Sequence, residues 1–363
     1  MPRNEATIVG VAETAYTRQP ERPTPELLAE AAALALEDAR LRPQDVDGLG
    51  VSSFSLAPDH AIDLAWRLGL RLRWLMEDTN GGASGLNMLQ HARRAVEASD
   101  AHAVLLLAGD ALGAEDFRRL TDEYNTATRD HLTPIPTGGP NALFALLTQR
   151  HMAAHGLARE DYGRLVIAQR AAAAGNPNAL YREALSADAY LEAPLVAEPL
   201  GRFDCVPIAS GADAVLVARG HLGVRIRAFR SAYNHDGQEG DGLRTGIDAG
   251  GLWHEAGLHP DDMDVVEVYD DYPAIVLVQL AELGFGHPHE ILDRISSGAL
   301  RVNTGGGQLS AGQAGAAGGM LGLVEAVRRL RDDARTALVT GYGMVAYRYG
   351  ACANAVVLEA PRQ

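Results

Sequence analysis

Apolar positions along the chain follow two spacings, one typical of helices and one typical of strands, and clusters of Gly and Asn separate the segments. Short apolar strands are expected at residues 103–108 and 336–340, each directly after a helical segment. Helices and strands that alternate in this way are typical of a sheet covered by helices. The pattern therefore predicts an α/β protein.

A repeated segment indicates that the chain contains two related halves. The sequence LRPQDVDGLGV at residues 41–51 returns as LHPDDMDVVEV at residues 258–268, with Leu, Pro and both Asp in step. A second similarity follows in the same order, since the helical segment 85–94 resembles 319–329. Amphipathic helices resemble one another through their shared period, so chance is the alternative. Two matches in one order favour a duplication.

The duplication divides the chain into an N-terminal half, residues 1–222, and a C-terminal half, residues 223–363. The first half is longer because residues 113–200 intervene before its last strand, expected at 206–218. This intervening stretch is helical, polar and interrupted by prolines. We interpret it as an inserted cap that covers one face of the protein.

Composition and charge exclude several classes of protein. The 363 residues are 47% hydrophobic and 22% charged, which describes an ordinary globular chain. A net charge of −15 disfavours binding to nucleic acid or anionic membranes. No apolar run approaches the roughly 18 residues of a membrane span, and no signal-peptide core is evident, so a cytoplasmic protein is expected.

The two cysteines, Cys205 and Cys352, are too few for a disulfide scaffold or a cysteine-rich zinc site. Both are expected to be small buried side chains on apolar strands. No spacing of metal ligands is present, so no metal site is expected in this chain.

Two glycine-rich segments, residues 80–85 and 303–319, open the helices of the second similarity. The first amide groups of a helix attract negative charge, and glycine permits close approach of a ligand. The alternative role for these glycines is to allow tight packing of helices, and one segment can serve both roles. Neither segment fits a phosphate-binding or dinucleotide-binding motif. The candidate substrate-binding residues are Gly81, Gly82, Gly306 and Gly312.

Several motifs resemble one family over nearly the whole chain. They are Gly82-Ala83-Ser84-Gly85, Asn176-Pro177-Asn178-Ala179, the segment 203–215, Glu267-Val268-Tyr269-Asp270-Asp271-Tyr272 and Gly312-Gln313-Ala314. They resemble, in part, the Cys-Ala-Ser-Gly turn, the His-Asp-Cys-Phe box and the Gly-His-Pro motif of the thiolase superfamily. The similarity is greatest to the sterol-carrier-protein-like thiolases.

The resemblance implies the thiolase fold, with two βαβαβαββ halves in five layers, α-β-α-β-α, and an inserted helical cap. The catalytic positions are altered. Gly82 stands in place of the nucleophilic cysteine, Tyr269 in place of the box histidine and Gln313 in place of the histidine that activates the cysteine. Thiolysis needs a thiolate beside a base, so ordinary thiolase activity is not expected.

Retro-aldol cleavage of a β-hydroxyacyl-CoA needs no covalent acyl carrier. It requires a base for the β-hydroxyl proton and hydrogen-bond donors for the thioester oxygen as the enolate forms. We expect the Gln313 amide to be one such donor, together with backbone amides around Gly81 and Gly82. Loss of the cysteine side chain also makes room for a tertiary alcohol.

The base or acid is expected among residues at two strand ends. One cluster of candidates, Tyr269, Asp270, Asp271 and Tyr272, lies between a strand and a helix that has Pro273 in its first turn. The other, Tyr342, Tyr347 and Tyr349, follows the strand at 336–340, and Tyr269, Asp270 and Tyr342 are the preferred members. The alternative for the tyrosines is a place in the core, and Asp270 can simply cap a helix. The acid that protonates the enolate is left unassigned.

Relatives that lack the cysteine include aldolases that shorten steroid side chains, so the resemblance implies a steroid-like acyl-CoA substrate and no cofactor in this chain. It also implies a homodimer that forms a heterotetramer with a small zinc-ribbon and OB-fold partner. Two alternatives remain open. The chain is a thiolase or acyltransferase component of a complex, or a non-catalytic subunit that binds acyl-CoA or lipid.

Overall fold

The computed structural model describes residues 5–58, 60–123, 126, 128–132, 134, 139–220, 222–235, 243–346 and 349–362. Within these residues nine strands form one mixed sheet in the order β3-β2-β4-β7-β1-β8-β11-β10-β9. The strands are β1 (Ala6–Glu13), β2 (Gly48–Ser52), β3 (Trp74–Glu77), β4 (Ala103–Asp110), β7 (Gly211–Arg219), β8 (Val224–Tyr233), β9 (Val265–Glu267), β10 (Thr336–Ala346) and β11 (Tyr349–Glu359).

The two ends of this sheet repeat one arrangement. In the first, β2 is parallel to β4, and β7 runs antiparallel to both β4 and β1. In the second, β9 is parallel to β10, and β11 runs antiparallel to both β10 and β8. The third strand of the second half is reduced to a bridge between Val266 and Val302, where β3 stands beside β2 in the first. In the described part of the sheet, two residue pairs between β1 and β8 connect the strands of the two halves.

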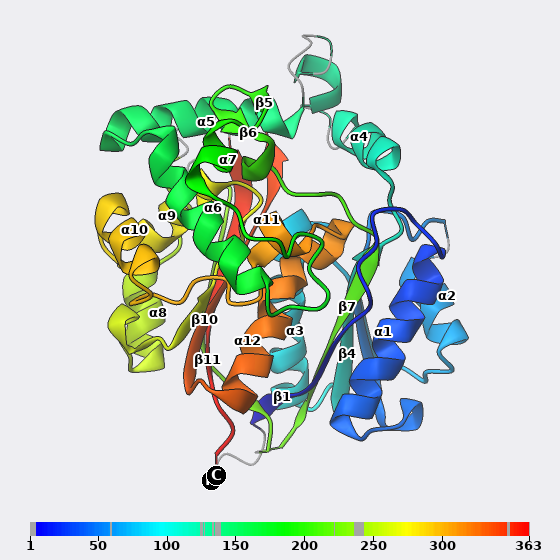
Figure 1. The fold of residues 1–363 in the computed structure, drawn as a ribbon. Coiled ribbons are helices and arrows are strands. Elements are labelled where there is room, and N and C mark those ends of the chain that lie inside the picture. The colour runs from blue at the N-terminus through cyan, green and yellow to red at the C-terminus, as the bar shows by residue number, and fades with distance from the viewer. Residues whose placement is uncertain are drawn as a thin grey trace.

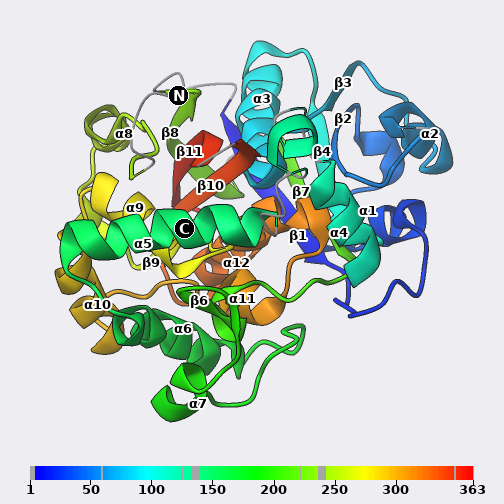
Figure 2. The ribbon, with the colours of Figure 1, turned by 90° about the horizontal axis from the view of Figure 1, so that it is seen from above.

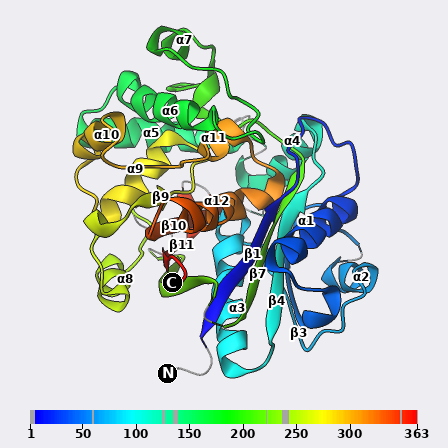
Figure 3. The ribbon, with the colours of Figure 1, turned by 60° about the horizontal axis from the view of Figure 1, so that its bottom comes forward.

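Helices complete five layers (Figures 1 and 3). The middle layer holds α3 (Ser84–Ala98) and α12 (Gly318–Asp332), whose apolar faces pack between the two halves of the sheet. Helices α1 (Thr24–Ala39) and α2 (His60–Arg67) cover the outer face of the first half. Helices α8 (Ala249–Ala256), α9 (Pro273–Glu282) and α10 (Pro288–Ser296) cover that of the second.

Residue spacing explains why these segments are helical. In α1 the buried residues Leu27, Leu28, Ala31 and Ala35 recur every three or four positions, which places them on one face. The helix ends where Arg40 takes a left-handed conformation, with φ of 55°. None of the described helices is both long and apolar enough to cross a membrane.

Helices α5 (Pro140–His155) and α6 (Arg159–Ala173) of the inserted segment pack on the second half, to which they do not belong in sequence. The segment also contains α4 (Ala114–Asp122), the π-helix η3 (Thr128–Leu132), α7 (Ala187–Leu191), the two short strands β5 (Leu195–Ala197) and β6 (Leu200–Gly201) and the 3₁₀ helix η4 (Arg202–Asp204). Phe144 of α5 and Leu165 of α6 belong to the core cluster of the second half. Seen from above, α5 crosses the ends of β10 and β11 (Figure 2).

The predicted fold class is confirmed, including the five layers and the helical cap. The division at residues 222 and 223 stays a prediction. Some strand limits differ from those expected. Strand β10 continues to Ala346, so Tyr342 lies within a strand and not after it, because β11 pairs with β10 along this length. Strand β7 begins at Gly211, so the expected start at residue 206 is wrong.

Glycine allows the two central helices to touch through their backbones. A Cβ atom on Gly85 would lie 2.2 Å from the carbonyl oxygen of Gly319, and one on Gly319 would lie 2.7 Å from that of Gly82. Non-bonded carbon atoms normally stay about 3.5–4.0 Å apart, so neither position has room for a side chain. The packing role considered for the glycine-rich segments is therefore present at the start of α3 and α12.

Substituting Gly85 tests this contact. We expect Gly85→Ala to lower the free energy of unfolding by roughly 1–3 kcal/mol, because the methyl group forces the two helices apart. Urea denaturation measures this change. Gly250→Ala is the matched control, since its Cβ would lie 3.8 Å from the nearest atom within α8 and alanine favours a helix by about 1 kcal/mol. Equal stability of the two variants would contradict the close approach.

Candidate active site

A cavity of about 420 Å³ lies where the cap meets both halves of the protein. Its walls come from the 3₁₀ helix η2 (Gly81–Ala83), from α4 and the start of α5, from the segment after η4 and from the junction between β9 and α9. The lining surface is mainly apolar, and its polar groups come from α4 and the start of α5 on one side and from the β9–α9 junction on the other. The residues at its inner end are Gly81, Gly82, Tyr269, Asp271, Tyr272, Gln313, Tyr342 and Gly343.

The ring of Tyr269 occupies the space that a side chain at residue 82 would need. A Cβ atom on Gly82 would lie 2.1 Å from Cε2 of Tyr269 and 2.3 Å from the carbonyl oxygen of Tyr342. The structure thus leaves no space for the side chain of a nucleophile at residue 82. A side chain there and the present position of Tyr269 exclude each other.

Tyr269 and Gln313 form a polar pair that faces the cavity. The Gln313 side-chain amide donates a hydrogen bond of 3.2 Å to the Tyr269 hydroxyl and another of 3.2 Å to Oε1 of Gln308. Two backbone hydrogen bonds to the segment before β7 hold Gln313 in place. Its amide donates to the carbonyl of Pro207, and its carbonyl accepts from the amide of Ala209. The structure therefore brings two of the predicted site residues together.

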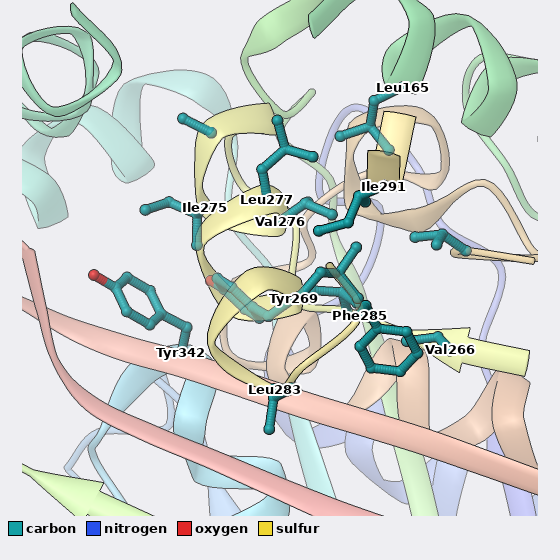
Figure 4. Packing of buried hydrophobic residues seen from close by; sticks show 14 of the residues in the cluster. Leu165, Val266, Tyr269, Ile275, Val276, Leu277, Leu283, Phe285, Ile291 and Tyr342 are labelled. Atoms are coloured by element: carbon teal, nitrogen blue, oxygen red, sulfur yellow. The ribbon is translucent and has the colours of Figure 1, made fainter. Parts of the chain in front are cut away.

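Tyr342 lines the same cavity from β10, and its hydroxyl is bound to the backbone. The amide of Gly350 donates a hydrogen bond of 2.7 Å to that hydroxyl, and the ring lies edge-on to Phe144 of the cap. Figure 4 shows Tyr269 and Tyr342 beside α9, with Tyr342 rising from the strand. The structural alternative for Tyr342 is thus present, and its catalytic role stays a prediction.

Asp270 points away from the large cavity. Its carboxylate accepts hydrogen bonds from the backbone amides of Gln308 and Leu309, at the start of the short helix α11 (Gly307–Ala311), and from the side chain of Gln169 in the cap. It lines a separate cavity of about 20 Å³, and burial raises its pKa to about 7. The helix-capping alternative for Asp270 is present, on α11 and not on the helix that begins at Pro273.

The four candidate glycines fall into two groups. Gly81 and Gly82 line the large cavity, and Gly81 has a φ of 58°. Gly306 and Gly312 have φ values of 99° and 116° and do not line it. A Cβ on Gly306 would contact Ala173 of the cap at 2.5 Å. A substrate-binding role for this second pair stays a prediction, and its geometry serves a turn against α6.

Asp271 belongs to the candidate cluster of the sequence analysis but was not among its preferred residues. Its side chain lines the large cavity at 9% exposure, and its Oδ1 atom has no hydrogen-bond partner among the described residues. Burial raises its pKa to about 8, and the neighbouring Asp270 carboxylate adds to that effect. Two successive carboxylates at a strand-to-helix junction were a signal, because adjacent side chains of an extended segment point to opposite sides.

The cysteines are poorly placed for nucleophilic chemistry. Burial raises the pKa of Cys205 to about 12 and that of Cys352 to about 11, which disfavours the thiolate. Cys352 is buried on β11 as predicted, whereas Cys205 follows η4, is only partly buried and lines the cavity. The strand position expected for Cys205 is therefore wrong, because the last strand of the first half starts later. Among the described residues, no cluster of three His, Cys, Asp or Glu is arranged to hold a metal ion.

A buried carboxyl lies behind the site on β9. Glu267 accepts hydrogen bonds from the amide and hydroxyl of Thr304, at 3.1 and 2.6 Å. Burial raises its pKa to about 8, and the nearby Glu325 carboxylate contributes. A group with a raised pKa binds a proton more tightly in the folded state than in the unfolded state. Glu267 is therefore a source of pH-dependent stability.

We expect Glu267→Gln to reduce the pH dependence of stability. Between about pH 5 and pH 8 the folded wild type holds one more proton at residue 267 than the unfolded chain, so its free energy of unfolding decreases as pH rises. In the variant, the free energy of unfolding should therefore fall less steeply with pH, by up to about 1.4 kcal/mol per pH unit. Urea denaturation at several pH values measures it, with the exposed Glu183→Gln as control. An unchanged slope would contradict the raised pKa.

A double-mutant cycle tests the exclusion between residues 82 and 269. We expect Gly82→Ala to lower the free energy of unfolding by roughly 1–3 kcal/mol. The same change should cost less in a Tyr269→Ala background, because the ring is gone while the Tyr342 carbonyl still limits the space. Denaturation of all four proteins gives the coupling. Strictly additive costs would show that the ring does not occupy this space.

Comparison with known proteins places the fold and the site in a family. The thiolase C-terminal domain-like family matches residues 248–354. The chain is 32% identical to 17-hydroxy-3-oxo-4-pregnene-20-carboxyl-CoA lyase of Mycobacterium tuberculosis, over 91% of this chain and 92% of that protein. It is 30% identical to a steroid side-chain-cleaving aldolase of Thermomonospora curvata, over 90% of each.

Solved structures agree with these relatives. The structure of an Ltp2-ChsH2(DUF35) aldolase superposes with a TM-score of 0.82 at 26% identity, over 99% of both chains. Human mitochondrial 3-ketoacyl-CoA thiolase, at 16% identity, shares the fold with a TM-score of 0.75. The chain therefore belongs to the thiolase superfamily and, within it, to the family that includes the steroid side-chain-cleaving aldolases.

Proposed function

We propose that this protein is a carbon–carbon lyase that cleaves a β-hydroxyacyl-CoA thioester by a retro-aldol reaction, with a steroid-like acyl group. The observation that carries the proposal is the position of Tyr269. Its ring fills the space beside Gly82 and its hydroxyl is bonded to Gln313 at the inner end of a mainly apolar cavity. This arrangement has room for a non-covalent reaction and none for a nucleophile at residue 82.

The reaction needs stabilisation of the negative charge that develops on the thioester oxygen. The Gln313 amide and the first backbone amides of η2, at Gly81 and Gly82, supply donors at one end of the cavity. The oxygen would accept from Gln313 in place of the Tyr269 hydroxyl. The Tyr269 oxygen then lies beside the reacting carbons, where Tyr269 in its phenolate form takes up the β-hydroxyl proton as the bond between Cα and Cβ breaks.

The two cysteines bear on the acyltransferase alternative. Acyl transfer through an enzyme thioester needs a reactive thiolate, and burial raises the pKa of both thiols far above neutrality. The polar pair in the cavity favours chemistry over simple acyl-CoA binding. We therefore prefer the lyase to either alternative reading.

A partner subunit is part of the proposal. The most similar solved structure named above is an assembly of Ltp2 with ChsH2(DUF35). We propose that a small partner of the zinc-ribbon and OB-fold kind binds this chain as well, around a homodimer, in the cytoplasm. The CoA thioester is the substrate, and the chain's own residues suffice for the reaction without a further cofactor.

The lyase activity is tested with a steroid-like β-hydroxyacyl-CoA and no free CoA. We expect a short acyl-CoA and a carbonyl compound in equal amounts, measured by mass spectrometry for the chain alone and with its partner. Tyr269→Phe should lower kcat/KM by roughly 10²–10⁴-fold. Tyr233→Phe, a half-exposed tyrosine on β8, is the matched control.

Other results would redirect the assignment. Products that form only from a β-ketoacyl-CoA plus free CoA would mean thiolysis. Tight acyl-CoA binding without any product would mean a binding subunit. Full activity of Tyr269→Phe would remove Tyr269 from the chemistry, and a comparable loss in Tyr342→Phe without loss of stability would add Tyr342 to it.

A further inference from the structure

Asp271 differs from the other buried carboxylates near the cavity because its hydrogen bonds are incomplete. Asp110 accepts bonds from Ser53, Ser55 and several amides, and Asp270 accepts three. Oδ1 of Asp271 has no partner in the described part of the chain, although the side chain is only 9% exposed. A buried polar atom without a partner costs roughly 1–3 kcal/mol, so its retention calls for an explanation.

The position of Asp271 supplies one. The residue lies in the junction between β9 and α9 and lines the cavity together with Tyr269 and Gly82. Pro273 begins α9 directly after the junction, which fixes the backbone that carries the carboxyl. The Asp271 side chain therefore lines the same cavity as the proposed reacting centre, while its unpartnered Oδ1 atom is itself buried.

Among the described residues, no cation is one of the groups that shift the pKa of this carboxyl, although Arg118 lines the same cavity. The charged and titratable groups around it are Asp270, Tyr269 and Tyr272 from its own junction, Cys205 from the segment after η4, Tyr342 from β10, and Arg118 and Asp122 from α4 at the cavity wall. The effects that lower its pKa are hydrogen bonds from the backbone amides of Asp271 and Tyr272. Burial outweighs them, so the pKa rises to about 8 and the carboxyl is mostly protonated at neutral pH.

Retro-aldol cleavage involves two proton transfers. One group removes the β-hydroxyl proton while the electron pair of the Cα–Cβ bond moves into the thioester, which forms the carbonyl product and an enolate. A second group then gives a proton to Cα of the enolate, which forms the short acyl-CoA. The first is assigned above to Tyr269. The second needs an acid that holds its proton at neutral pH and reaches the cavity.

We propose that Asp271 is the catalytic residue that protonates Cα of the enolate. This inference rests on the proposed function. The carboxyl gives its proton to Cα and becomes a carboxylate. The Tyr269 phenolate, which the β-hydroxyl has protonated, releases that proton to solvent, and the Asp271 carboxylate takes one up from solvent. Protons balance over the cycle, and no oxidant, reductant or metal is required. In the reverse direction, the Asp271 carboxylate removes a proton from Cα of a short acyl-CoA.

Deuterium exchange isolates this step from carbon–carbon cleavage. Acetyl-CoA and propionyl-CoA are incubated in D₂O with the wild-type chain, alone and with its partner, and deuterium at Cα is followed by mass spectrometry. We expect catalysed exchange in the wild type and a decrease of at least 100-fold in Asp271→Asn. Asp188→Asn, on the exposed side of α7, is the matched control and should exchange at the wild-type rate.

The two reactions should depend on pH in opposite directions, which a purely structural role of Asp271 would not produce. Exchange requires the carboxylate, so its rate should rise with pH and level off above about pH 8. Cleavage requires the protonated acid, so its kcat/KM should fall above about pH 8. Asp271→Glu should retain part of both activities with a displaced midpoint. Thermal melting shows that each variant is folded.

The outcomes separate the two proposals. Absence of cleavage in the wild type, with exchange present and lost in Asp271→Asn, would overturn the lyase and keep Asp271 as the group acting at Cα. Cleavage in the wild type with wild-type exchange and unchanged pH profiles in Asp271→Asn would overturn the role of Asp271 alone. A wild type that shows neither reaction would overturn both.

Discussion

The close contact of glycine backbones at the centre of the molecule is the constraint on which the rest of the structure depends. The starts of α3 and α12 touch through Gly85 and Gly319, and β10 passes against the same turn at Gly341 and Gly343. Each of these positions would place a Cβ atom within 3 Å of a neighbouring atom. At these positions the two halves approach closely enough that no side chain fits.

This contact also determines what the site can contain. Because the backbone of β10 lies directly against Gly82, the space above that residue is limited to one group, and the ring of Tyr269 takes it. The ring position in turn brings the hydroxyl to the Gln313 amide. Glycine at residue 82 and tyrosine at residue 269 therefore go together, because the ring fills the space that a side chain at residue 82 would need.

Burial divides the carboxylates around the centre into two kinds. Asp110 and Asp270 are held by amides and side chains from distant segments, and they join the halves and the cap. Asp271 keeps an oxygen without a partner beside the cavity. Fully bonded buried groups stabilise one arrangement, whereas an incompletely bonded one costs stability and is typical of a functional position.

Apolar periodicity and the repeated motif are local properties of the chain, so they could predict the α/β class, the duplication and the cap. The resemblance to thiolases added the five layers and the expectation of altered catalytic positions. Tyr269 was also predicted between a strand and a helix that has Pro273 in its first turn, as observed. Which of two neighbouring side chains faces the cavity depends on tertiary contacts that no local pattern shows. Asp270 and Asp271 are chemically identical and adjacent, and they point to different cavities because α11 attracts one of them with its free amides. Tyr342 is a second example, because its hydroxyl accepts a hydrogen bond from the amide of Gly350 on the paired strand β11. The sequence pattern did not show that β10 and β11 pair as far as this residue.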